Sequence, residues 1–278
     1  MSDRLDPAEE SEDLLLSRYG TRPMWGWRKP EFAAVTDLAF DARLAMNPAF
    51  RDLAHRARQN PVRRVHVASV DVPNRRNDLE RVLSALKQTH NEVTVSLAPL
   101  GDRGKFQNIN VALAEVDLSG VDWLVVTDDD IAFPPHFLDH FLCACEAASL
   151  KIAQPAHRFR SHTSWAITQR MWNSLVHLTH FVECGPLTAF HRDMFGLILP
   201  FPETRWAWGL DVIWGEIARR ENLAIGVVDA TPIAHLRPVA EIYDSGAAVS
   251  EARALLERFG VRRSNREILT TTAVLTRL

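Results

Sequence analysis

Apolar runs of strand length alternate with amphipathic stretches along the first half of the chain. The stretch 78–87 carries its apolar residues on one helical face, with Asn77 or Asp78 as the expected N-cap, and 107–114 predicts a shorter helix. Buried strands are predicted at 65–70, 92–97 and 123–127, because these runs have the length and the apolar side chains typical of such strands. Strands separated by helices in this order predict βαβ units and an α/β fold with a doubly wound sheet.

The second half of the chain continues this pattern less regularly. Further helices are predicted after Pro134 and Pro135, at 211–220 and at 249–259. Further strands are predicted at 152–155, 182–190 (a strand or a hairpin) and 225–229. Residues 161–179 mix polar and aromatic side chains, so their pattern assigns no element.

The N-terminal part of the chain differs from the rest. Its first 20 or so residues are acidic and poor in apolar side chains, which predicts a disordered or loosely attached segment, and 37–46 has the pattern of a helix. We therefore expect a partly disordered N-terminal extension over residues 1–60 and a single domain over 61–278. Whether the extension packs across that domain or shapes a binding site stays open.

Three consecutive carboxylates, Asp128, Asp129 and Asp130, directly follow the predicted buried strand 123–127. Ligands of open α/β sheets bind beyond the carboxyl ends of such strands. Alternation along an extended chain places Asp128 and Asp130 on one side and Asp129 on the other. Two neighbouring carboxylates repel each other unless a proton or cation separates them, so the pattern predicts a site for Mg²⁺ or Mn²⁺. The alternative is a polar turn that caps the following helix.

Composition narrows the possible partners. The formal net charge is −3, so no global basic field attracts nucleic acid or anionic lipid, and a phosphate must be met by a local basic cluster or a metal. Cys143, Cys145 and Cys184 are interpreted as core thiols in a reducing compartment. The sequence shows no secretion signal and no apolar run of bilayer length, so we expect a cytoplasmic protein. Its oligomeric state is left open.

Four segments, in this order, resemble the GT-A glycosyltransferases, most closely the family 2 type and the glycosyltransferase-like proteins of plants and bacteria. They span about 63–238 and comprise the Gly-Lys segment 104–113, the aspartate-rich strand end 125–130, the Phe-Val-Glu segment 181–192 and Trp-Ala-Trp-Gly-Leu-Asp at 206–211, followed by 225–229 and His235. The resemblance implies a GT-A type doubly wound mixed sheet in one catalytic domain with an N-terminal extension. It also implies transfer of a sugar from a nucleoside-diphosphate sugar to an acceptor hydroxyl.

The resemblance implies a role for each candidate residue. Asp128 and Asp130 would hold the metal (Mn²⁺ or Mg²⁺) with His235 as a further ligand, Asp128 also facing the ribose. Asp211, at the start of a helix, would be the general base of an inverting transfer, although it could simply cap that helix. The residues expected to bind the donor are Asp71, Arg75, Arg103, Lys105, Asn108, Asp128, Glu183 and Trp208.

The sequence departs from this family in two places. Leu210 stands where many family members carry an acidic residue. The Gln/Arg-x-x-Arg-Trp signature of processive members is missing, which argues against a polymer synthase.

Two other functions compete with this interpretation. A Mg²⁺-dependent phosphohydrolase of the haloacid dehalogenase type also uses Asp-x-Asp at a strand end, but normally after the first strand of its core. The other alternative is a non-catalytic module that binds a nucleotide or a sugar.

Overall fold

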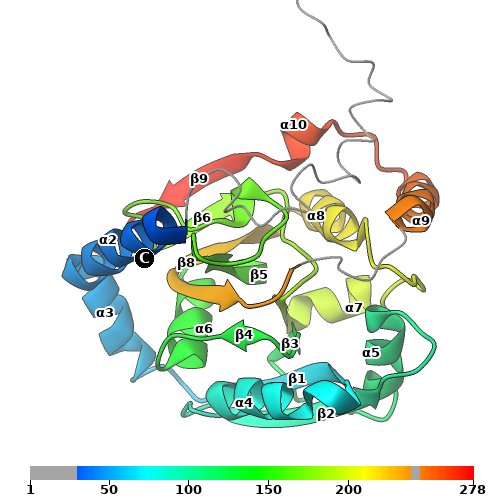
Figure 1. Ribbon diagram of the computed structural model, residues 1–278, viewed down its shortest axis with the longest axis horizontal. Coiled ribbons are helices and arrows are strands. Elements are labelled where there is room, and N and C mark those ends of the chain that lie inside the picture. The colour runs from blue at the N-terminus through cyan, green and yellow to red at the C-terminus, as the bar shows by residue number, and fades with distance from the viewer. Residues whose placement is uncertain (1–29, 239–244) are drawn as a thin grey trace, which may run out of the picture.

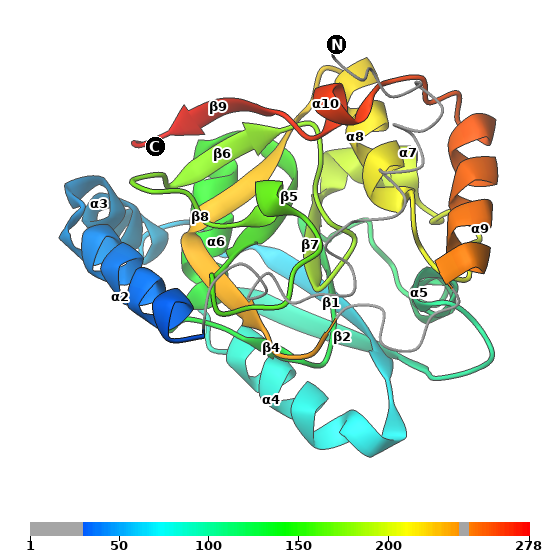
Figure 2. The same cartoon turned by 45° about the horizontal axis from the view of Figure 1, so that its top comes forward.

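A computed structural model describes residues 30–238 and 245–278, and its centre is one nine-stranded sheet (Figures 1 and 2). Eight strands follow one another across it in the order β2, β1, β3, β7, β5, β8, β6 and β9, and β4 pairs with β8 from outside this path. The strands are β1 (Arg64–Asp71), β2 (Glu92–Pro99), β3 (Trp123–Thr127), β4 (Ile131–Ala132), β5 (Leu150–His157), β6 (Val176–Thr179), β7 (Leu187–His191), β8 (Ala224–His235) and β9 (Thr271–Leu275).

The sheet is mixed, which confirms the predicted α/β class. β1 runs parallel to both β2 and β3, and β5 runs parallel to β8. β7 is antiparallel to its neighbours β3 and β5, and β6 is antiparallel to β8 and β9. β3 lies between β1 and β7 in the sheet, so its carboxyl end is beside the carboxyl end of β1 and the start of β7.

Helices cover both faces of the sheet because β3 is apolar on both sides. Trp123 and Val125 face a core shared with α3 (Pro48–Ala57), α4 (Arg76–Leu86) and α6 (Phe137–Ala147). Leu124 and Val126 face the second core, formed with α5 (Lys105–Leu113), α7 (Phe195–Ile198), α8 (Leu210–Arg220) and α9 (Ser245–Arg258). Complete burial of a large apolar side chain stabilises a fold by about 1.5–3 kcal/mol, so this strand is firmly fixed.

The helix α2 (Pro30–Met46) is tied to the loop that follows β5. The carboxylate of Asp37 accepts hydrogen bonds from the backbone N–H of Phe159 (3.0 Å) and Arg160 (2.8 Å) and lies 3.4 Å from the guanidinium of Arg170. In Figure 2, α2 and α3 lie together at one edge of the molecule. The predicted disorder of the first 20 residues falls outside the described part of the chain. Among the described residues, no helix combines the length and apolar character that crossing a bilayer requires.

Several predicted boundaries were wrong. Helix α4 begins at Arg76, so Asp78 lies in its first turn and binds Arg81 and Arg237 instead of capping the helix. In the predicted element 182–190, only β7 (Leu187–His191) is extended, and the residues before it form a loop. Strand β8 continues to His235, so this side chain ends the strand instead of following it. The short helix α10 (Asn265–Ile268) and strand β9 were not predicted.

Candidate active site

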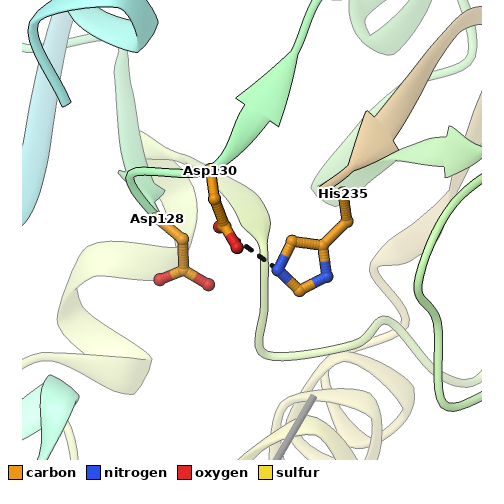
Figure 3. Close-up of side chains that lie close together, drawn as sticks. All are labelled: Asp128, Asp130 and His235. Atoms are coloured by element: carbon orange, nitrogen blue, oxygen red, sulfur yellow. Dashed lines mark ion pairs between the residues drawn. The ribbon is translucent and has the colours of Figure 1, made fainter. Parts of the chain in front are cut away.

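Asp128, Asp130 and His235 converge where β3 and β8 end. One potential ligand atom from each residue lies within 4.8 Å of the other two (Figure 3). The closest contact joins Asp130 Oδ1 to Nε2 of His235 at 3.2 Å. The strand geometry explains this convergence, because β4 pairs Ile131 with His235 and so brings the end of the aspartate triplet against the end of β8.

The charges of Asp130 and His235 stabilise each other. Burial lowers the pKa of His235, but the hydrogen bond and negative charge of Asp130 outweigh it and raise the pKa above its ordinary value. For Asp130, burial raises the pKa, but the hydrogen bond from His235 and the positive charges of His235, Arg237 and Lys105 together outweigh it, so the net direction is down. Each group therefore favours the charged form of the other, with Oδ1 of Asp130 and Nε2 of His235 facing each other.

Asp129 lines the same cavity as Asp128 and Asp130, but it pairs with arginines instead of His235 or Lys105. Its Oδ1 accepts a hydrogen bond from Arg237 at 3.0 Å and lies 4.0 Å from the guanidinium of Arg75. Burial and the neighbouring charge of Asp130 raise the pKa of Asp129. Arg237 also binds Asp78 of α4, so it joins the aspartate triplet to this helix.

A cavity of about 370 Å³ opens over the three aspartates. Its wall is rich in cationic side chains beside the carboxylates, which suits an anionic ligand accompanied by a cation. Lys105 Nζ lies 2.7 Å from Asp128 Oδ1. The described residues that line the cavity are Ser69, Val70, Val72, Arg75, Leu100, Arg103, Gly104, Lys105, Asn108, Asp128, Asp129, Asp130, Arg205, Trp206, His235, Arg237 and Pro238.

The loop before β7 closes one side of this site. Asp128 N–H donates to the carbonyl of Pro186 at 2.8 Å, and Lys105 Nζ donates to the carbonyl of Cys184 at 3.3 Å. Gly185 lies so close that an added Cβ would be 3.2 Å from Asp128 Oδ2 and 3.7 Å from Lys105 Nζ. The absence of a side chain at Gly185 therefore keeps this wall against the carboxylate.

Asp211 lies behind this loop, in the first turn of α8. Its carboxylate accepts the backbone N–H of Val212 at 2.9 Å. Burial is the main cause that raises the pKa of Asp211 to about 7, and the charge of Glu183 adds to it. Burial raises the pKa of the Cys184 thiol, and the charge of Asp211 adds to this effect, so Cys184 lies close to Asp211.

The structure separates the predicted site residues into two groups. Those that line the cavity are Arg75, Arg103, Lys105, Asn108, Asp128, Asp130 and His235. The other four, Asp71, Glu183, Trp208 and Asp211, do not line the cavity. Asp71 is paired with Arg76, and Glu183 faces His157. Trp208 packs on Val249 and Ala252. The sequence did not predict a role for Arg237, which lines the cavity and donates to Asp129 from two residues beyond His235.

The donor set fits a divalent cation. Carboxylate oxygens suit Mg²⁺ and Mn²⁺, an imidazole nitrogen suits the transition metals, and Asp128, Asp130 and His235 supply both kinds. The predicted ion would be held by these three side chains. When bound, such an ion acts as a Lewis acid on a phosphoryl oxygen.

Comparison with known proteins gives distant similarity. No protein-family model matches the chain, and no curated protein matches its sequence. The catalytic domain of Drosophila beta1,4galactosyltransferase 7 in complex with xylobiose aligns with TM-score 0.42 and 14% identity, over 69% of this chain and 81% of that one. GalNAc-T7 with UDP, GalNAc and Mn²⁺ aligns with TM-score 0.44 and 10% identity, over 70% of this chain and 48% of that one. A197 from STIV aligns with TM-score 0.41 and 14% identity, over 63% and 86% of the two chains.

Proposed function

We propose that the protein is a metal-dependent glycosyltransferase that moves a sugar from a nucleoside-diphosphate sugar to an acceptor hydroxyl with inversion. One observation carries the proposal: two carboxylates and an imidazole converge within 4.8 Å on the wall of a cavity that also presents Lys105 and Arg237. Departure of a diphosphate builds negative charge, and fixed cations aimed at that charge stabilise it. The bound cofactor is Mn²⁺ or Mg²⁺.

Each cavity residue has a task in this reaction. Lys105 and Arg103, at the start of α5 and just before it, bind phosphate oxygens by charge-assisted hydrogen bonds. Arg75 lies at the carboxyl-end side of β1, where the nucleoside enters. Asn108, buried in α5, already donates to the carbonyl of Arg103 at 3.4 Å and so shapes the loop that carries that arginine. Trp206 offers a flat apolar surface to a base or a sugar ring.

Asp211 is the general base in this proposal. A base works best when its pKa is close to the working pH, and burial brings the pKa of Asp211 to about 7. Asp211 does not line the cavity, so in this proposal the acceptor hydroxyl reaches it beside the loop that carries Glu183 and Cys184. Glu183, whose charge acts on Asp211, is assigned to bind acceptor hydroxyls.

The sheet topology weighs against a haloacid dehalogenase-like phosphohydrolase. The acidic triplet follows the third strand of the chain, after two strand–helix units, and β3 has an antiparallel neighbour, β7. A non-catalytic binding module would keep the cavity and the cation but would have no need of a buried base. Asp211→Asn separates these two: transfer is lost in the enzyme, whereas metal-dependent nucleotide binding survives.

Thermal unfolding with a panel of nucleoside diphosphates, with and without Mn²⁺, tests the proposal. One diphosphate is expected to stabilise the protein only when metal is present, by about 2.7 kcal/mol at 100 times its Kd. Asp130→Asn should abolish this effect, whereas Asp193→Asn, which breaks a surface pair with Lys151, should keep it. Release of free phosphate in place of sugar transfer would point to the hydrolase, and no response to any diphosphate would refute both.

A further inference from the structure

Two residues of the loop after β5 hold His235 at three points. The backbone N–H of His162 donates to the carbonyl of His235 at 3.0 Å. The backbone N–H of His235 donates to Oγ of Ser161 at 2.9 Å. The ring Nδ1 of His235 lies 3.2 Å from the carbonyl oxygen of His162. Main chain and ring of one residue are thus fixed by the same dipeptide, which we call the 161–162 clamp.

The clamp decides which nitrogen of His235 can bind a cation. A carbonyl oxygen only accepts, so Nδ1 must carry the proton in its contact with His162. In the neutral ring the lone pair then belongs to Nε2, the atom that lies 3.2 Å from Asp130 Oδ1. A ligand histidine is oriented in this way when its second nitrogen donates to a fixed acceptor.

The hydroxyl of Ser161 is itself oriented by a second histidine. His157, the last residue of β5, places Nδ1 3.1 Å from Ser161 Oγ. When the hydroxyl donates to this nitrogen, its lone pairs are left for the N–H of His235. Ser161 is 1% exposed and His157 is fully buried, so water does not compete for these bonds. The other nitrogen of His157, Nε2, lies 3.3 Å from Glu183 Oε2.

We propose that Ser161 and His157 are positioning residues that set the metal affinity of the site through His235. The proposal rests on the proposed function, because it presumes that His235 binds the cation. Neither residue lines the cavity, so any effect on metal binding must pass through the clamp. Glu183 belongs to the same chain of contacts, which links the loop beside Asp211 to the metal ligand.

Mn²⁺ titration of the intact protein, followed by the electron paramagnetic resonance signal of free Mn²⁺, tests this chain. Ser161→Ala and His157→Leu are expected to weaken Mn²⁺ binding about 10- to 100-fold, the range for residues that orient a ligand. His157→Asn should restore most of the affinity, because its amide oxygen can stand where Nδ1 accepts the Ser161 proton. This rescue is not expected of a residue that only fills space.

A matched control distinguishes an effect on the positioning of His235 from a general loss of stability. Thr168→Val removes a buried hydroxyl of the same region, one that donates to the carbonyl of Trp165 at 2.8 Å and lies 3.0 Å from Thr163 Oγ1. It should lower the melting temperature while leaving the Mn²⁺ affinity unchanged. Wild-type affinity in Ser161→Ala would overturn the inference alone. Absence of Mn²⁺ binding in the wild type, with or without nucleoside diphosphates, would overturn the proposed function and the inference together.

Discussion

Replacement of Asp211 by asparagine should remove activity and increase stability at the same time. The carboxylate is buried in the first turn of α8, and its hydrogen bond from Val212 N–H only partly replaces lost hydration. Asparagine keeps an oxygen that can accept this bond but carries no charge. The ionised carboxylate therefore lowers the stability of the folded state, and the substitution should remove this cost of burying a charge.

The magnitude follows from the pKa of Asp211, which burial raises from 3.8 to about 7. Each unit of this rise corresponds to about 1.4 kcal/mol, so ionisation of Asp211 destabilises the folded state by about 4 kcal/mol above pH 7. Between pH 4 and pH 7 the folded state keeps a proton that the unfolded state releases. The free energy of unfolding of the wild type should therefore fall as pH rises through this window, and the effect disappears near pH 4.

Urea unfolding of both proteins at pH 4.5 and pH 8 measures the difference. Asp211→Asn should exceed the wild type by up to about 4 kcal/mol at pH 8 and by under about 1.5 kcal/mol at pH 4.5. Glu216→Gln on the same helix is the control of opposite sign, because hydrogen bonds from Arg219 and Arg220 lower the pKa of Glu216 and ionisation stabilises the fold there. A stability difference between Asp211→Asn and wild type that does not depend on pH would refute the reasoning.

Three further substitutions probe the surroundings of the aspartates. Lys105→Met removes the ammonium 2.7 Å from Asp128 and should strengthen Mn²⁺ binding without nucleotide while weakening nucleoside-diphosphate binding in parallel titrations. Gly185→Ala places a Cβ 3.2 Å from Asp128 Oδ2 and should weaken Mn²⁺ binding about tenfold in the same assay. His177→Gln leaves the buried carboxylate of Asp229, 2.7 Å from the ring, without its counter-charge and should destabilise by about 3–5 kcal/mol in urea at pH 6.

Each of these three predictions has a control or an outcome that would contradict it. If Lys105→Met lowered the affinity for Mn²⁺ as well as for nucleoside diphosphates, the substitution would have disturbed the fold and not simply removed the positive charge beside Asp128. Gly196→Ala adds a Cβ that meets no atom within 4 Å, so its Mn²⁺ affinity should equal that of the wild type. Burial lowers the pKa of His177, but Asp229 outweighs it and the net direction is up. The contribution of this pair should be full below pH 6.5 and decline as pH rises through the raised pKa, a decline that His177→Gln should not show.

Strand β3 is an element that the sequence predicted well, and it is buried on both faces. Strand β3 has five consecutive buried residues, and a run without polar positions has few other interpretations. Strand β9 alternates between half-buried and exposed positions in only five residues, and β6 has only four residues, so neither gives a periodic signal of useful length. Their pairing partners lie far away in the sequence, and tertiary contacts decide their conformation.

The site divides in the same way. Asp128 and Asp130 were predicted to lie together because both directly follow the end of a buried strand, and the structure brings them together there. Arg237 and His157 were not, because each acts through a partner from a distant segment: Arg237 on Asp129, 108 residues earlier, and His157 on Glu183 in the loop before β7. Only the register of β4 against β8 and the path of the loop after β5 bring these groups together.

The three aspartates show how backbone geometry, not residue type, assigns roles at this site. They have identical side chains, yet Asp128 is paired with Lys105 and has a side chain 32% exposed, whereas the side chain of Asp130 is 7% exposed and faces His235. Asp129 pairs with Arg237. The pairing of Ile131 with His235 between β4 and β8 places the preceding residue, Asp130, against the imidazole. The partner of each carboxylate therefore follows from its place in the chain after β3 and not from its side-chain type.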